Sequence, residues 1–154
     1  MHRRLKISMM ATALALALPL AARAQDDWRH HHPHYVQAMS DVSMAYQLLR
    51  RAHGDPPARP AEEQAMAAIE EAYQTLQNAA AIDRRNIDDL PPPDDSTYDQ
   101  RGRLYRAVDL LRDAREQLDA AEFDSDARGL RDRAKRQILD AADATKEAIR
   151  IMRY

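Results

Sequence analysis

Four histidines lie within five positions near the start of the chain, at His30, His31, His32 and His34. Imidazole is a good ligand for Zn, Cu and Ni, and side chains this close in sequence can share one ion. A physiological metal site also needs ligands held in a fixed geometry. Pro33 favours extended backbone in the residue before it, which does not hold the histidines around one ion. Two interpretations stay open: a metal-binding cluster, or the flexible lead-in to a helix with structural or incidental histidines, which we favour.

Other residue types give little support for catalysis. The chain has no cysteine, which excludes disulfides, a lipid-modified cysteine and covalent c-type haem. A di-iron bundle needs Glu-x-x-His pairs on two helices, and the sequence contains none. Met39, Met44 and Met66 could reach a core, but methionines on helices usually fill gaps there. We therefore predict that the protein is not an enzyme and has no resident cofactor apart from a metal ion on the histidines.

The first 24 residues have the pattern of a secretory signal peptide. Basic residues precede an apolar stretch that is too short for a mature membrane helix, and Ala22 and Ala24 supply the small side chains required at a cleavage site. We expect Sec export, cleavage before Gln25, no membrane span afterwards, and a periplasmic or secreted location. Residues 25–32 would then form the His-rich N-terminal segment.

Cleavage changes the charge balance of the chain. The leader takes four of the 23 basic residues with it, so the 130-residue mature chain has 19 basic and 25 acidic residues and a formal net charge of −6. Acidic and basic residues alternate along the chain, which is typical of a solvated helical surface. We therefore expect no nucleic-acid partner.

From Pro33 onward the apolar residues recur with helical spacing in four segments, separated by "HGDPPAR", a Pro-rich acidic linker and "EFDS". Gly54 suits the end of the first helix, Pro60 the first turn of the second, and Ser125 the N-cap of the fourth. The predicted apolar stripes are Tyr35, Ala38, Val42, Ala45, Leu49 and Ala52; Ala65, Ile69, Ala72, Leu76, Ala79 and Ile82; Leu104, Ala107, Leu111, Ala114, Leu118 and Ala121; and Leu130, Ala134, Ile138, Ala141, Ala148 and Ile151.

A shift of 69 residues superimposes the two halves of the mature chain without a gap. One offset aligns both helices of each half and the turn between them, where "DPPAR" (55–59) meets "DSDAR" (124–128). Chance alignment of alanine-rich helices does not readily explain this agreement, so we predict an internal duplication.

A helical hairpin buries only one face against its own partner, so two copies are expected to pack together. The sequence therefore predicts an all-α, antiparallel four-helix bundle over 33–154, built from duplicated hairpins 33–84 and 102–153 with a linker at 85–101. Both an up-down-up-down order and a crossover order fit this linker, and the first is simpler.

The segments "HPHYVQAMSD" (32–41), "NIDDLPPPDD" (86–95), "GRLYRAVDLLRDA" (102–114) and "GLRDRA" (129–134) together resemble an uncharacterised family of short exported bacterial helical proteins. The resemblance spans nearly the whole mature chain and implies no activity. It does imply that His32 to Tyr35 belong to the architecture, whereas His30 and His31 are additions. Ser43 also differs from the basic residue that the family pattern implies after Val42.

Together these features predict a non-enzymatic exported bundle that is a monomer or a small homo-oligomer. We expect it to bind an unknown protein partner, as a partner-binding or envelope-stress module. The alternative is a periplasmic metal-binding or metal-buffering protein that uses His30, His31, His32 and His34.

Overall fold

The computed structural model describes residues 33–51, 55–82, 97–121 and 125–152. Within these ranges it contains helices α2 (Pro33–Arg50), α3 (Arg59–Ile82), α4 (Gln100–Ala120) and α5 (Arg128–Ile151), and no strand. The all-α prediction is confirmed. The predicted signal peptide, the segment 25–32 and most of the linker lie outside the described residues.

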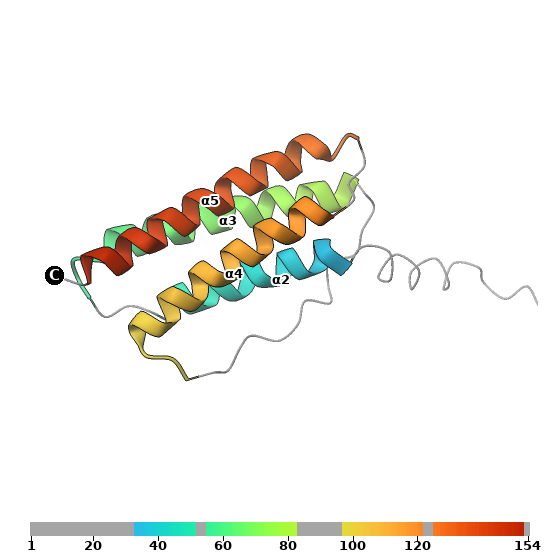
Figure 1. Ribbon diagram of the computed structural model, residues 1–154. Helices are drawn as coiled ribbons and strands as arrows, with labels where there is room; N and C mark the ends of the chain where they lie inside the picture. The colour runs from blue at the N-terminus through green and yellow to red at the C-terminus, as the bar shows by residue number, and fades with distance from the viewer. Residues whose placement is uncertain (1–32, 52–54, 83–96, 122–124, 153–154) are drawn as a thin grey trace, which may run out of the picture.

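Each helix packs against two others: α2 and α5 both contact α3 and α4 (Figure 1). The four neighbouring pairs are antiparallel. His34, near the start of α2, contacts Gln117, near the end of α4, and Arg101, at the start of α4, donates to the carbonyl of Met152 after α5. This arrangement is an antiparallel four-helix bundle, as predicted.

The order of the helices around the bundle is the crossover order. Helix α3 ends where α2 begins, whereas α4 begins at the opposite end, so α3 and α4 run in the same direction on opposite corners (Figure 1). Residues 83–96 can reach about 46 Å when extended, whereas α4 is only about 32 Å long. The chain is therefore long enough for the crossover, and the simpler up-down-up-down order is not adopted.

The two hairpin turns have the same local structure, 69 residues apart. Ala58 precedes α3 and Ala127 precedes α5, and both are fully buried. The amide of Glu62 donates to the carbonyl of Ala58 at 3.1 Å, and that of Arg131 donates to Ala127 at 3.0 Å. Ser125 does not cap α5, contrary to the prediction, because the helix begins three residues later with Ala127 at the N-cap.

Helix α4 begins two residues earlier than the predicted hairpin, at Gln100. Asp99 has extended backbone, and its carboxylate accepts a hydrogen bond from the amide of Gly102 at 2.6 Å, so it satisfies one of the unpaired donors of the first turn. A Cβ on Gly102 would lie 2.8 Å from the Asp99 carboxylate, so a larger residue there would require the Asp99 side chain to shift.

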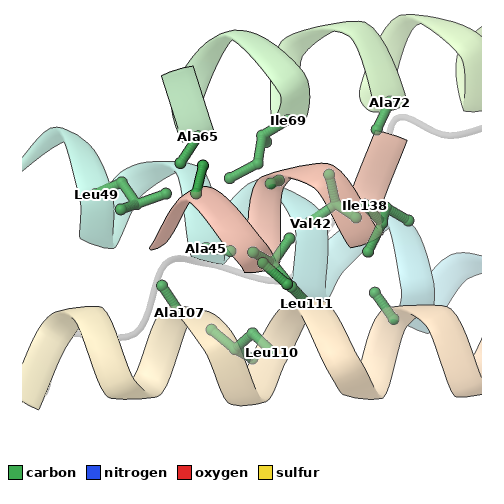
Figure 2. Packing of buried hydrophobic residues seen from close by; sticks show 14 of the residues in the cluster. Val42, Ala45, Leu49, Ala65, Ile69, Ala72, Ala107, Leu110, Leu111 and Ile138 are labelled. Carbon is green, nitrogen blue, oxygen red and sulfur yellow. The ribbon is translucent and has the colours of Figure 1, made fainter. Parts of the chain in front are cut away.

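The core is built largely from alanine and leucine, which lets the helices approach closely. Figure 2 shows Val42 of α2, Ile69 of α3, Leu111 of α4 and Ile138 of α5 within the buried cluster. Of the predicted stripe residues, Ile82 is 45% exposed because it is the last residue of α3.

Burial follows the predicted 69-residue offset through both hairpins. The pairs buried on both sides include Ala38 and Ala107, Val42 and Leu111, Ala45 and Ala114, Leu49 and Leu118, Ala65 and Ala134, Ile69 and Ile138, Ala72 and Ala141, and Ala79 and Ala148. Equivalent helices lie side by side and antiparallel, so the hairpins are related by an approximate twofold axis perpendicular to the bundle. In the described ranges no helix combines the length and the apolar character needed to cross a membrane.

Candidate functional site

His34 is the one member of the predicted metal cluster that the structure describes. It is exposed in the first turn of α2, and its Nδ1 donates a hydrogen bond to Oε1 of Gln117 on α4, at 2.5 Å. An amide oxygen only accepts, so the proton of this contact belongs to the ring. His34 thus ties the start of α2 to the end of α4. His30, His31 and His32 lie outside the described residues.

Among the residues described, no group of three or more His, Asp or Glu side chains has the geometry to hold a metal ion. The predicted histidine site stays a prediction, since three of its four members are not described.

Asp41 is a carboxylate that the sequence analysis did not single out. It lies on α2 and is only 4% exposed, and Nε2 of Gln37 donates to it at 2.8 Å. Burial raises the pKa of Asp41, the repulsion of Asp113 adds to the rise, and the Gln37 hydrogen bond and Arg106 oppose it. The residue 69 positions later is Leu110, which is buried. Asp41 therefore breaks the approximate symmetry of the core.

A groove of about 390 Å³ runs between α2 and α3. Its lining consists of Ser43, Tyr46, Ile69, Glu70, Tyr73, Gln74 and Gln77. We call this the tyrosine groove.

The phenol of Tyr46, on α2, donates to Oε1 of Glu70, on α3, at 2.6 Å. This hydrogen bond is the main reason that the pKa of Tyr46 is raised, because the phenol loses a favourable contact when it gives up its proton. The bond joins the two helices at the groove and holds the Glu70 carboxylate beside the aromatic ring.

The second hairpin has different side chains at the positions equivalent to the tyrosine groove. Arg115 replaces Tyr46, Leu139 replaces Glu70, Ala142 replaces Tyr73 and Lys146 replaces Gln77. The hollow of about 280 Å³ beside α4 and α5 is lined by Arg115, Asp132, Lys135, Arg136 and Leu139. Equivalent faces of the two hairpins thus differ in aromatic content and in charge.

A wider hollow, about 540 Å³, lies on α3 and α5 and is lined by Gln64, three alanines and four carboxylates. Three of these carboxylates already have partners. Asp143 pairs with Lys146 at 2.8 Å, Glu147 accepts from Arg150 at 2.7 Å, and Glu71 accepts from Gln137 at 3.3 Å. Lys146 and Arg150 offset the charges of Asp143 and Glu147, and the lining of this hollow contains no aromatic side chain, so we consider the tyrosine groove the better candidate site.

Comparison of the chain with protein-family models, curated proteins and solved structures finds no match. The assignment of the candidate site is therefore argued from the chemistry and geometry of its side chains alone. Tyr46, Glu70 and Tyr73 were missed in the sequence analysis because it emphasised what the two halves share. A signal was present, since these are positions where duplicated halves carry residues of different chemistry.

Proposed function

We propose that the protein is a non-enzymatic exported bundle that binds a partner protein in the tyrosine groove. The observation that carries this proposal is the half-buried pair Tyr46 and Tyr73 in a groove between two packed helices. Tyrosine supplies a large contact area at low entropic cost and is enriched at interfaces. The rigid bundle holds both rings in place, which lowers the cost of ordering them.

The chemistry of the groove supports binding rather than catalysis. Its side chains are two phenols, two amides, a hydroxyl, an isoleucine and one carboxylate. The raised pKa of Tyr46 keeps its phenol protonated at neutral pH, so it is a poor base and a poor nucleophile. The Glu70 carboxylate already accepts a hydrogen bond from the Tyr46 hydroxyl. The remaining groups are suited to contact and hydrogen bonding.

In-cell photocrosslinking tests this function. A photoreactive phenylalanine placed at the exposed position Gln77 lies in the groove, and the same residue at the exposed position Lys146 is the matched control, 69 residues later. We expect a discrete protein adduct from position 77 that Tyr73→Ala abolishes, and no such adduct from position 146. Equal adducts at both positions, or none at position 77, would contradict binding in this groove.

A further inference from the structure

The tyrosine groove has the charge to recognise a cation. Glu70 is the single charged side chain in its lining, so the lining carries a net charge of −1. The equivalent positions on the second hairpin include Arg112, Arg115 and Lys146 with Asp143, a net charge of +2. The two faces share one backbone arrangement but have opposite charge.

The aromatic rings favour the same kind of ligand. Tyr46 and Tyr73 both line the groove: Tyr46 contacts Glu70 from α2, and Tyr73 lies three residues after Glu70 on α3. Aromatic rings attract ammonium and guanidinium groups. The Tyr46 hydroxyl holds Glu70 at 2.6 Å. Since a carboxylate can accept several hydrogen bonds, this contact leaves acceptor capacity for a lysine or arginine side chain.

The shape and the amides of the groove favour a peptide over a small amine. On α3 the lining runs from Ile69 to Gln77, a length of about 12 Å at 1.5 Å per residue. Three to four extended residues cover such a length, at about 3.3 Å each. Gln74 and Gln77 are exposed, and their side-chain amides can both donate to and accept from a peptide backbone.

We propose that the tyrosine groove binds a short extended basic segment of a partner protein, with a lysine or arginine side chain on Glu70 between Tyr46 and Tyr73. This inference rests on the proposed function and names the chemistry of its partner. The backbone of the segment runs along α3 over Gln74 and Gln77.

NMR titration of the isotopically labelled protein, purified from the host that exports it, tests the inference. The probes are blocked peptides Ser-Ala-Ser-X-Ser-Ala-Ser in which X is lysine, norleucine or glutamate. We expect the lysine peptide to shift the amide signals around Tyr46 and Tyr73 and to bind about fivefold more tightly than the norleucine peptide. The glutamate peptide should bind most weakly.

Variants separate charge from shape. Glu70→Gln keeps an acceptor for Tyr46 and should remove the preference for lysine over norleucine, and Glu70→Lys should reverse it towards glutamate. Arg115→Ala changes a charge on the second hairpin, at the position equivalent to Tyr46, and should change neither. In the Glu70→Gln variant the pKa of Tyr46, followed through its ring signals, should also fall towards its ordinary value, because the charged acceptor is gone.

Three results would overturn the inference: no lysine preference, a preference that survives Glu70→Gln, or cadaverine binding as tightly as the lysine peptide. If the peptides fail while crosslinking at position 77 succeeds, the basic-segment inference fails and the proposed function stands. If crosslinking at position 77 also fails, the proposed function fails with it.

Discussion

At the scale of the residue, Asp41 is, with Glu62, one of two buried carboxylates among the described residues. Its carboxylate is buried on α2, at a position where the second hairpin has a leucine. Ionising a buried carboxyl costs free energy, which the contacts with Gln37 and Arg106 only partly offset. Proteins retain such groups where titration or specific pairing outweighs the loss of stability.

The raised pKa of Asp41 gives a pH dependence with a definite sign. In the unfolded chain this carboxyl titrates near 3.8, whereas the folded state holds the proton to higher pH. Between these two values the folded state binds more protons, so the free energy of unfolding falls as pH rises. Compared with Asp41→Asn, which does not titrate, the wild type should lose stability from about pH 4 upward until the raised pKa is passed.

At pH 7, Asp41→Leu should raise the free energy of unfolding by about 1–3 kcal/mol, because it removes a buried charge and restores the residue type of the equivalent position. Urea unfolding of the three proteins at pH 4, 5.5 and 7 measures both effects. A leucine variant less stable than the wild type at pH 7 would show that the polar contacts of Asp41 outweigh its desolvation.

The histidines give a second prediction at this scale. Because extended backbone before Pro33 does not preform a metal site, the four imidazoles should bind Zn, Cu or Ni only modestly, and acid should release the metal as protons compete for the ring nitrogens. Replacing His30, His31, His32 and His34 by alanine should abolish uptake in calorimetric titration and leave metal tolerance of the host unchanged.

In the absence of metal, substitution of His34 and substitution of the other three histidines should affect stability differently. His34→Ala removes the contact with Gln117 and should cost about 0.5–1.5 kcal/mol. The triple variant at positions 30, 31 and 32 should melt like the wild type. Tight, selective binding together with a metal-sensitive mutant host would instead establish the metal-buffering function.

At the scale of the element, each helix contributes one apolar stripe, and equivalent helices face each other across the approximate twofold axis. Leu49 on α2 and Leu118 on α4 are equivalent and fully buried. Their packing is therefore expected to contribute similarly to stability.

Leu49→Ala and Leu118→Ala should each lower the free energy of unfolding by about 2–5 kcal/mol. Leu139→Ala is the control, since Leu139 is 39% exposed and its truncation should stay within about 0.5 kcal/mol. Circular dichroism during chemical unfolding measures all three. A near-neutral effect at one buried leucine and a severe effect at the other would contradict the equivalence of that layer.

At the scale of the whole molecule, the two hairpins repeat the same pattern of buried residues but differ in the side chains on their surfaces. The tyrosine groove carries the phenols and Glu70, whereas the equivalent positions of the second hairpin carry Arg115, Leu139 and Ala142. One repeated core arrangement therefore supports two surfaces with different side chains.

Export is a prediction for the whole chain. Because Ala22 and Ala24 satisfy the small-residue rule of signal cleavage, we expect the mature protein to begin at Gln25. Intact-mass analysis of the periplasmic fraction and of the culture medium measures the mature N-terminus and the location. A chain that retains the N-terminal sequence "MHRRLK" would contradict export by cleavage.

The helical segments, most of their buried stripes and the equivalence of the two hairpin turns could be predicted from the amino-acid sequence. This is possible because helical periodicity and backbone preferences are local: an alanine or leucine every three or four residues defines a face whatever the face packs against. The exceptions are at helix ends, where Ile82 is exposed and Ala127 takes the N-cap position expected of Ser125.

The pairing of neighbouring helices could not be predicted and is seen first in the packed bundle. An apolar stripe requires a partner but does not specify one, so the sequence could not choose the crossover order, in which α2 packs on α4 and α3 on α5. The same reason explains Asp41 and the tyrosine groove. The burial of Asp41 depends on α4, and the groove exists because Tyr46 and Glu70, 24 residues apart, meet across two packed helices.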